Sequence, residues 1–364
     1  MEFGVALATP ADAWKAAKRA EDVGYGSAWF FDTQSLGADV FTAMGAAAVK
    51  TERIHLATGV LIPSNRIAPV AANAYATLNA LAPGRIRAGI GTGFTGRLTM
   101  GLGPYKLADM SDYIRVMQGM WRGETVEVLL ESKSRKVRFL NPERGLINIR
   151  DPIPVYVSAF GPKARRLAAG LGAHWINVDL SEGFSAAIAA AEEMNGLYRA
   201  AGVDPATRRK TVFLWGSVLR DGESCDSPRV KAECGPFAVQ VLHAIMEAWD
   251  RGATAGVGTD ASAPQDESLI PRMAREYRKL YESYQPADAR YLALHRGHLL
   301  FLRPDEAHFA TGELIQATTI TGSVAELRSR IRRLADAGYD EVVAAITPGC
   351  ENMIDDWMGV FSGV

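Results

Sequence analysis

A short pattern recurs along the chain: an alanine-rich helical segment ends at a glycine, and a run of strand-forming residues follows. Residues 20–25 (AEDVGY) lead into 27–31 (SAWFF), and residues 334–339 (LADAGY) lead into 341–345 (EVVAA). Two more copies lie between them, at 81–90 and 171–178. Glycine ends helices because it adopts the left-handed conformation without a steric penalty. Helix-to-strand units at both ends of one chain predict a closed barrel of alternating strands and helices.

The rest of the sequence fits this plan as an α/β fold, a (β/α)8 TIM barrel built as one domain over residues 1–364. The expected strands are 2–9, 27–32, 54–61, 85–91, 154–158, 174–179, 211–219 and 341–347. The expected helices are 11–23, 39–50, 68–81, 108–122, one from 162, 185–201, 323–337 and 351–361. Alternation of apolar and polar residues over 126–140 predicts an added β-hairpin.

An insertion is expected at 220–320, after the seventh strand, mostly irregular with helical pieces at 237–250 and 268–283. A loop of this length is uncommon in a compact domain unless it has a function such as closing over a ligand. The insertion is therefore predicted to be a lid. Its apolar face would be formed by Trp249, Tyr277, Tyr281, Tyr284 and Phe301.

Charge and composition exclude several classes of function. The net charge is −1 and the pI is about 6.6, which predicts neither a nucleic acid nor an anionic membrane as partner. No run of about 18 apolar residues is present, and a strand is expected from residue 3, so we expect neither a membrane span nor a signal peptide. Cys225, Cys234 and Cys350 lack metal-ligand spacing, which predicts free thiols, a cytoplasmic location and no metal site.

The active site of such a barrel lies at the carboxyl ends of its strands. The expected strand ends are rich in glycine and threonine and lack paired carboxylates, a lysine or a histidine cluster. They suit a large planar, phosphorylated cofactor better than direct acid–base hydrolysis. In the segment 158–164, Gly161 precedes Pro162 at a helix start, and the free N–H groups there could bind an anion, with charge added by Lys163. The alternative is an ordinary strand-to-helix turn.

Residues 89–96 contain the pattern G-x-G-x-x-G. A dinucleotide-binding fold needs a helix that starts inside the loop and an acidic residue after the next strand. Residues up to about 106 are expected to be irregular and no strand supplies the acid, so the glycines more readily form a floor without side chains, which a ring system or substrate can approach.

Several segments together resemble the bacterial luciferase-like superfamily, and within it the methylenetetrahydromethanopterin-reductase-like branch. These segments are 29–34 (WFFDTQ), 51–60 (TERIHLATGV), 76–85 (ATLNALAPGR), 89–93 (GIGTG) and 158–164 (SAFGPKA). Members of this superfamily are flavin-dependent monooxygenases and deazaflavin-dependent reductases. The resemblance extends over nearly the whole chain.

The resemblance implies a barrel with an insertion after strand seven and a homodimer. It implies a non-proline cis peptide at Gly59–Val60 behind the cofactor ring, and phosphate binding by the turn after strand five and by backbone after strand six. The cofactor-binding residues that it implies are Gly59, Val60, Ala159, Phe160, Gly161, Pro162, Lys163, Val178 and Asp179. Thr58, Thr92 and Gly93 are added as cofactor-binding candidates from their positions at the ends of strands three and four.

The sequence departs from this branch at two places. It reads Asn65-Arg66-Ile67 where members often have a histidine after the arginine, and Phe94 follows Gly93 where members often have Gly-Asp. Both departures remove polar groups near the cofactor or substrate, so they leave the kind of flavin and the substrate open.

The acid–base candidates are few. His295 and His298 lie three residues apart in the insertion, and histidine is the side chain that titrates near neutral pH. One of them is expected to act at the substrate; the alternative is packing within the insertion. Asp32 and Gln34 end strand two, where some relatives place a catalytic histidine. Gln34 could hydrogen-bond the substrate or cofactor, and Asp32 could equally cap a helix or anchor a loop.

The main hypothesis is a monooxygenase that uses reduced FMN and oxygen to insert one oxygen atom into a small organic substrate, with FMN reduced by a separate flavin reductase. The alternatives are a deazaflavin (coenzyme F420)-dependent oxidoreductase that transfers a hydride, and a flavin-binding barrel without catalysis.

Overall fold

A computed structural model describes residues 1–178, 184–252 and 268–364. Within this part of the chain, eight parallel strands close into a barrel in the order β1-β12-β9-β8-β7-β4-β3-β2, which confirms the predicted fold class. The barrel strands are β1 (Glu2–Leu7), β2 (Ser27–Phe30), β3 (His55–Thr58), β4 (Ile86–Ile90), β7 (Val155–Ser158), β8 (His174–Asn177), β9 (Lys210–Leu214) and β12 (Glu341–Ile346).

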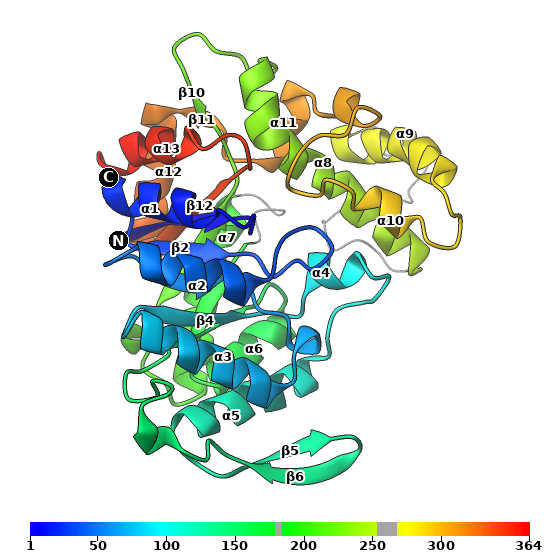
Figure 1. The fold of residues 1–364 in the computed structure, drawn as a ribbon. Coiled ribbons are helices and arrows are strands. Elements are labelled where there is room, and N and C mark those ends of the chain that lie inside the picture. Colours follow the sequence, from blue (N-terminus) through cyan, green and yellow to red (C-terminus); the bar gives the residue numbers. More distant parts are fainter. Residues whose placement is uncertain (179–183, 253–267) are drawn as a thin grey trace.

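Helices surround the barrel and the two termini lie side by side at one end (Figure 1). The barrel helices are α1 (Trp14–Val23), α2 (Val40–Lys50), α3 (Ala68–Leu81), α4 (Phe94–Leu98), α5 (Leu107–Trp121), α6 (Pro162–Gly170), α7 (Phe184–Ala200), α12 (Val324–Asp336) and α13 (Met353–Phe361). Short 3-10 helices are η1 (Pro63–Asn65), η2 (Pro142–Arg144), η3 (Pro205–Thr207) and η4 (Ala307–Phe309). Gly24 and Gly338 adopt φ of 107° and 89° at the ends of α1 and α12, as the recurring pattern predicts.

Large side chains fill the inside of the barrel. Tyr156 and Phe213 pack edge-on against Trp29, with ring centroids 5.2 and 5.4 Å from that of Trp29. Toward the amino ends of the strands, the buried guanidinium of Arg87 donates to the carboxylate of Glu341 at 3.1 Å. The amino end is thus closed, and open space is left at the carboxyl ends.

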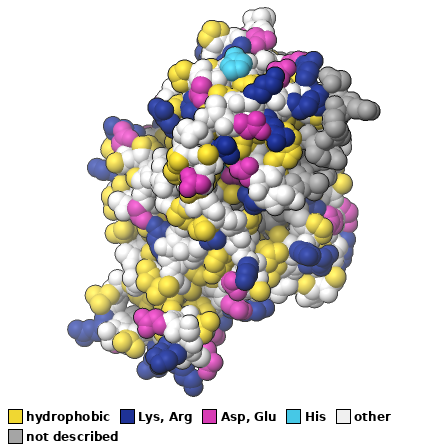
Figure 2. Space-filling view, turned by 90° about the vertical axis from the view of Figure 1, so that its right-hand side faces the viewer, with side chains coloured by type: hydrophobic (Ala, Val, Ile, Leu, Met, Phe, Trp, Pro, Cys, Tyr) yellow, Lys and Arg dark blue, Asp and Glu magenta, His cyan; other side chains and the backbone are white. Residues whose placement is uncertain are grey.

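Two additions extend the barrel. The predicted hairpin is present as β5 (Val126–Leu130) and β6 (Lys133–Val137), an antiparallel pair. It projects from the lower end of the molecule in the view of Figure 1, and lysine and arginine side chains gather at this end (Figure 2). The second addition is the insertion, with β10 (Val218–Leu219), α8 (Pro228–Asp250), α9 (Leu269–Ser283), α10 (Tyr291–Leu294), α11 (Gly312–Thr318) and β11 (Gly322–Ser323).

The expectation of a mostly irregular insertion was wrong for its described part. A helix was expected only from 237, yet α8 begins at Pro228 and continues through Gly235 and Pro236, two residues that disfavour a helix interior. Packing against α9 and α11 overrides the local preference. Three of the aromatic residues expected on the apolar face of a lid are not on such a face. Tyr277, Tyr281 and Tyr284 are buried in a separate hydrophobic core of the insertion.

Two other boundaries differ from the expectation. The segment after Gly93 was expected to be irregular, but it forms the short helix α4, with Gly93 as N-cap in the left-handed region. The seventh strand, expected at 211–219, is divided into β9 and β10, because β10 leaves the barrel to pair with β11.

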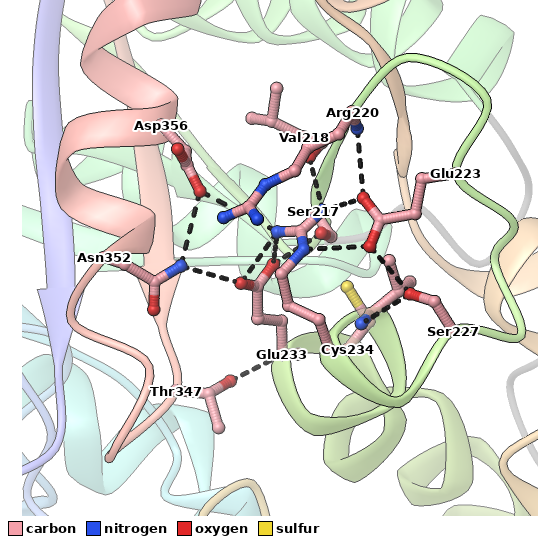
Figure 3. Close-up of polar contacts among 12 residues, drawn as sticks. Ser217, Val218, Arg220, Glu223, Ser227, Glu233, Cys234, Thr347, Asn352 and Asp356 are labelled. Carbon is pink, nitrogen blue, oxygen red and sulfur yellow. Dashed lines mark hydrogen bonds and ion pairs between the residues drawn. The ribbon is translucent and has the colours of Figure 1, made fainter.

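A polar network holds the first turns of α8 on the barrel (Figure 3). The buried carboxylate of Glu233 accepts hydrogen bonds from Ser217 Oγ at 2.5 Å, Asn352 Nδ2 at 3.0 Å and Arg229 Nη1 at 2.9 Å. The hydroxyl of Thr347 donates to the Glu233 carbonyl at 2.6 Å. Because Ser217 follows β9 and Thr347 follows β12, the insertion is fixed to two strand ends on the side of the barrel where the cavity opens.

In the described ranges, no helix combines the length and the apolar character needed to cross a membrane. The same ranges contain no group of three or more His, Cys, Asp or Glu residues placed to hold a metal ion.

Candidate active site

A cavity of about 420 Å³ lies at the carboxyl ends of the barrel strands. Its walls come from the segments that follow β2, β3, β4, β7, β8 and β9, and from residues 298–300 of the insertion. Most of its side chains are apolar or aromatic: Phe31, Leu36, Val60, Ile62, Phe94, Pro104, Tyr105, Leu107, Phe160, Ala164, Ile176, Val178, Phe213, Trp215, Leu299 and Leu300. The site is therefore where the fold predicts it and can exclude water from a bound ligand.

The floor of the cavity is made by β3 and β4. The peptide bond between Gly59 and Val60 is cis, as the resemblance implied, and both residues line the cavity. A Cβ on Gly91 would lie 2.6 Å from Cγ2 of Val60, so only glycine allows this approach. Thr58 is not in the lining; its hydroxyl donates to the Gly89 carbonyl and contacts the Tyr75 hydroxyl, both at 2.6 Å.

One end of the cavity meets the start of α6. Phe160, Gly161 and Ala164 line it, no side chain caps the helix, and a Cβ on Gly161 would meet no atom within 4 Å. The first N–H groups of a helix have no partner within it and attract anions. These features fit the phosphate group of a flavin or deazaflavin. Ala159, Pro162 and the exposed Lys163 lie outside the lining.

Asp32 lines the cavity, but its carboxylate is bound to the loop after β3. It accepts from the Ile62 N–H at 3.1 Å, from Asn65 Nδ2 at 3.2 Å and from Arg66 at 3.4 Å. Burial raises the pKa of Asp32, against the effect of these donors. The structure thus favours the loop-anchoring alternative considered for Asp32.

Gln34 lies outside the cavity lining, and both ends of its amide are engaged in the loops. Its side-chain nitrogen, Nε2, donates to the Gly96 carbonyl at 2.5 Å, and its side-chain oxygen, Oε1, accepts from Asn65 Nδ2 at 2.7 Å. Thr92, Gly93 and Val178 do line the cavity. Asp179 lies outside the described residues, so its predicted role stays a prediction.

His298 reaches the cavity from the insertion and is one of three buried histidines. Its Nδ1 lies 3.4 Å from Nδ1 of His243 and 3.2 Å from Nδ1 of His295. Its Nε2 lies 3.3 Å from the hydroxyl of Thr95, which also lines the cavity. His295 itself does not line the cavity but lies behind His298.

Two carboxylates lie behind these histidines. His243 Nε2 is 2.9 Å from Glu306, and His295 Nε2 contacts Glu247. Each carboxylate is also paired with an arginine: Glu306 with Arg303 at 2.6 Å, and Glu247 with Arg251 at 3.7 Å. A carboxylate in such an ion pair accepts hydrogen bonds and does not donate them.

The carboxylates determine the tautomers of the cluster. His243 and His295 must donate from Nε2, so in their neutral forms Nδ1 of each is an acceptor. The Nδ1 of His298, facing both acceptors, then carries the hydrogen. Its Nε2 then carries the lone pair and faces the hydroxyl of Thr95. His298 is thereby arranged as a proton acceptor at the cavity.

Burial, followed by the neighbouring His295 and His243, holds the pKa of His298 well below its ordinary value. Burial also lowers the pKa of His243, although Glu306 opposes this. His298 is therefore neutral at neutral pH, the state in which it accepts a proton.

The residues that orient His298 were not expected from the sequence. They are His243, Thr95, Glu247 and Glu306. A signal existed for one pair: Glu247 is four residues after His243 on α8, so both project from the same face of the helix. For the others no local pattern was available, because up to 203 residues separate the partners.

Comparison with known proteins identifies the family. The model of the family described as luciferase-like monooxygenase matches residues 3–341. The chain belongs to this family. It is 38% identical over 137 residues to an F420-dependent glucose-6-phosphate dehydrogenase of Beutenbergia cavernae, a match covering 35% of this chain and 39% of the relative. The chain thus spans about two fifths of the length of the curated relatives it matches.

Two solved structures are similar to this chain over nearly its whole length. One is an F420-dependent secondary alcohol dehydrogenase in complex with an F420-acetone adduct, with a TM-score of 0.66, 20% identity, and coverage of 99% of this chain and 97% of that one. The other is the coenzyme F420-dependent tetrahydromethanopterin reductase of Methanopyrus kandleri, with a TM-score of 0.67, 19% identity, and coverage of 98% and 97%. At these identities the likeness concerns the fold, and it is consistent with the branch that the sequence resembles.

Proposed function

We propose that this family member is a deazaflavin (coenzyme F420)-dependent oxidoreductase that transfers a hydride between the cofactor and an alcohol or carbonyl substrate. The observation that carries the proposal is a neutral His298, whose Nε2 is left as an acceptor at an apolar cavity. Oxidation of an alcohol needs such a group, because the hydroxyl must lose a proton as its carbon loses a hydride. The names of the curated relatives support the deazaflavin over FMN, which was the main expectation from the sequence.

When bound, the deazaflavin supplies the acceptor and donor of the hydride. The glycines of the floor, Gly59 and Gly91, would support its ring, and the N–H groups at the start of α6 would hold its phosphate. His298 would take the proton of the substrate hydroxyl at Nε2, with Thr95 beside it. The positive charge that develops on His298 would be stabilised through His243 and His295 by the carboxylates behind them. Phe213, Trp215 and Leu300 would keep water out of the site.

Titration of the purified protein with oxidised coenzyme F420 and, separately, with FMN tests this proposal. The expected result is quenching of protein fluorescence at micromolar deazaflavin, with much weaker binding of FMN. The loaded protein should reduce its cofactor with an alcohol under argon as fast as in air. Tighter binding of FMN, together with oxygen consumption that depends on substrate, would instead establish the monooxygenase alternative with its partner reductase.

A further inference from the structure

The cavity has an unusual charge pattern for a protein whose curated relatives are named for a sugar phosphate. Among the described residues that line it, none is a lysine or an arginine. Its two groups that titrate between acid and neutral pH are Asp32 and His298. One is an acid, and the other is held in its neutral form. The described part of the cavity therefore contains no cation for a phosphorylated substrate.

The arginine beside Asp32 is not free to serve a ligand. Arg66 lies behind Asp32 and is paired with two carboxylates, those of Asp32 and Asp39. It does not line the cavity. A phosphate placed beside Asp32 would meet the carboxylate first, which would repel it.

The two segments outside the described residues do not change this argument. Their sequences, 179–183 (DLSEG) and 253–267 (ATAGVGTDASAPQDE), contain five acidic residues and no lysine or arginine. Whatever their arrangement, these segments cannot supply a cationic side chain. The N–H groups at the start of α6 would be taken by the cofactor phosphate, so a second phosphate, on the substrate, would enter the apolar cavity without a partner and lose far more hydration energy than it regains.

We infer that the substrate carries no negative charge and is a small, largely apolar alcohol, or the corresponding ketone in the reverse direction. This inference rests on the proposed function and deepens it. The hydroxyl would bind between His298 Nε2 and Thr95 Oγ1, and the carbon skeleton would lie against residues such as Leu36, Trp215 and Leu300. A cavity of about 420 Å³ that also admits a ring system leaves space for a small substrate only.

The reaction balances with these groups alone. The carbinol C–H bond would break and its hydride would pass to the oxidised deazaflavin, which, when bound, would supply the two-electron acceptor. The O–H bond breaks and its proton passes to Nε2 of His298. The carbon–oxygen double bond of the ketone forms, and His298 later releases the proton to solvent.

The test compares propan-2-ol and cyclohexanol with glucose 6-phosphate on the protein loaded with coenzyme F420. We expect both neutral alcohols to bleach the visible absorbance of the oxidised cofactor and glucose 6-phosphate to leave it unchanged. Binding is measured separately on the loaded protein without turnover, with acetone and cyclohexanone. The readouts are the change in tryptophan fluorescence, to which Trp215 in the cavity wall contributes, and the thermal unfolding midpoint.

A pair of leucine variants tests whether the apolar lining of the cavity determines the activity on neutral alcohols. Leu36→Lys places a cation in the lining and is expected to lower kcat/KM for cyclohexanol by roughly tenfold or more, because the charge must stay hydrated. Leu102 is 44% exposed and outside the lining, so Leu102→Lys should leave the value unchanged. Circular dichroism verifies that both variants fold.

The outcomes separate the two proposals. Turnover of glucose 6-phosphate, or failure of the loaded protein to bind any neutral alcohol or ketone, overturns the inference about the substrate while leaving the deazaflavin function standing. Failure to bind the deazaflavin at all refutes the proposed function itself.

Discussion

Replacement of His298 by asparagine separates its two nitrogens. The asparagine amide nitrogen occupies a position like that of Nδ1, so it can still donate to His243 and His295, which lie 3.4 and 3.2 Å from Nδ1 in the native protein. The acceptor at Nε2 is lost. General-base catalysis by one side chain contributes about 10²–10⁴-fold, or about 2.7–5.5 kcal/mol of barrier. We therefore expect kcat for alcohol oxidation to fall by that factor, with the Kd of the deazaflavin unchanged.

The pH profile of the native protein provides a second test of the same group. A base with the ordinary histidine pKa of about 6.5 would lose roughly tenfold of its neutral form between pH 7.5 and 5.5. Because burial holds the pKa of His298 well below that value, the oxidation rate should stay nearly level over this interval. Stopped-flow reduction of the cofactor, measured from pH 5 to 8, gives the profile.

The matched control is His308→Asn, since His308 is exposed and does not line the cavity. Its rates should equal those of the native protein. The reasoning about His298 fails if His298→Asn retains more than about a tenth of the native kcat, or if the native rate falls with an inflection near pH 6.5.

Two further predictions concern the barrel. The Glu21 carboxylate accepts three backbone N–H bonds from residues 52–54, at 2.7–3.0 Å, and although burial opposes them they lower its pKa to about 2. The ionised carboxylate of Glu21 stabilises the folded protein at pH values above its unfolded pKa, and this contribution of about 3 kcal/mol should be lost as pH falls from about 4.5 to 2. In urea unfolding, Glu21→Gln should lower the free energy of unfolding at pH 7 and make its decrease over this acid range less steep. A decrease as steep as that of the native protein would contradict this role of Glu21. Gly91→Ala should push Val60 into the cavity and weaken deazaflavin binding at least about tenfold, whereas Gly103→Ala, where a Cβ meets no atom within 4 Å, should bind as the native protein does in fluorescence titrations.

Much of the barrel could be predicted from the sequence because its signals are local. A glycine at the end of a helix and a run of β-branched or aromatic residues after it act over fewer than ten residues, so α12 and β12 were expected close to their observed bounds. A further local signal is the capping box that Ser323 and Glu326 form at the start of α12. The insertion was predicted less well, since α8 continues through Gly235 and Pro236 only because neighbouring helices pack against it.

Some features of the candidate site could likewise be predicted from the sequence, and others could not. The sequence by itself determined that the site lies at the carboxyl ends of the strands, that glycines form its floor, and that His298 is a candidate base, because each of these follows from chain order and residue type. Only the tertiary structure decided that His295 lies behind His298, that Gln34 is engaged between loops, and that Glu247 and Glu306 fix the tautomers. The physical reason is that hydrogen bonding and charge depend on ångström distances between distant segments, which no local pattern encodes.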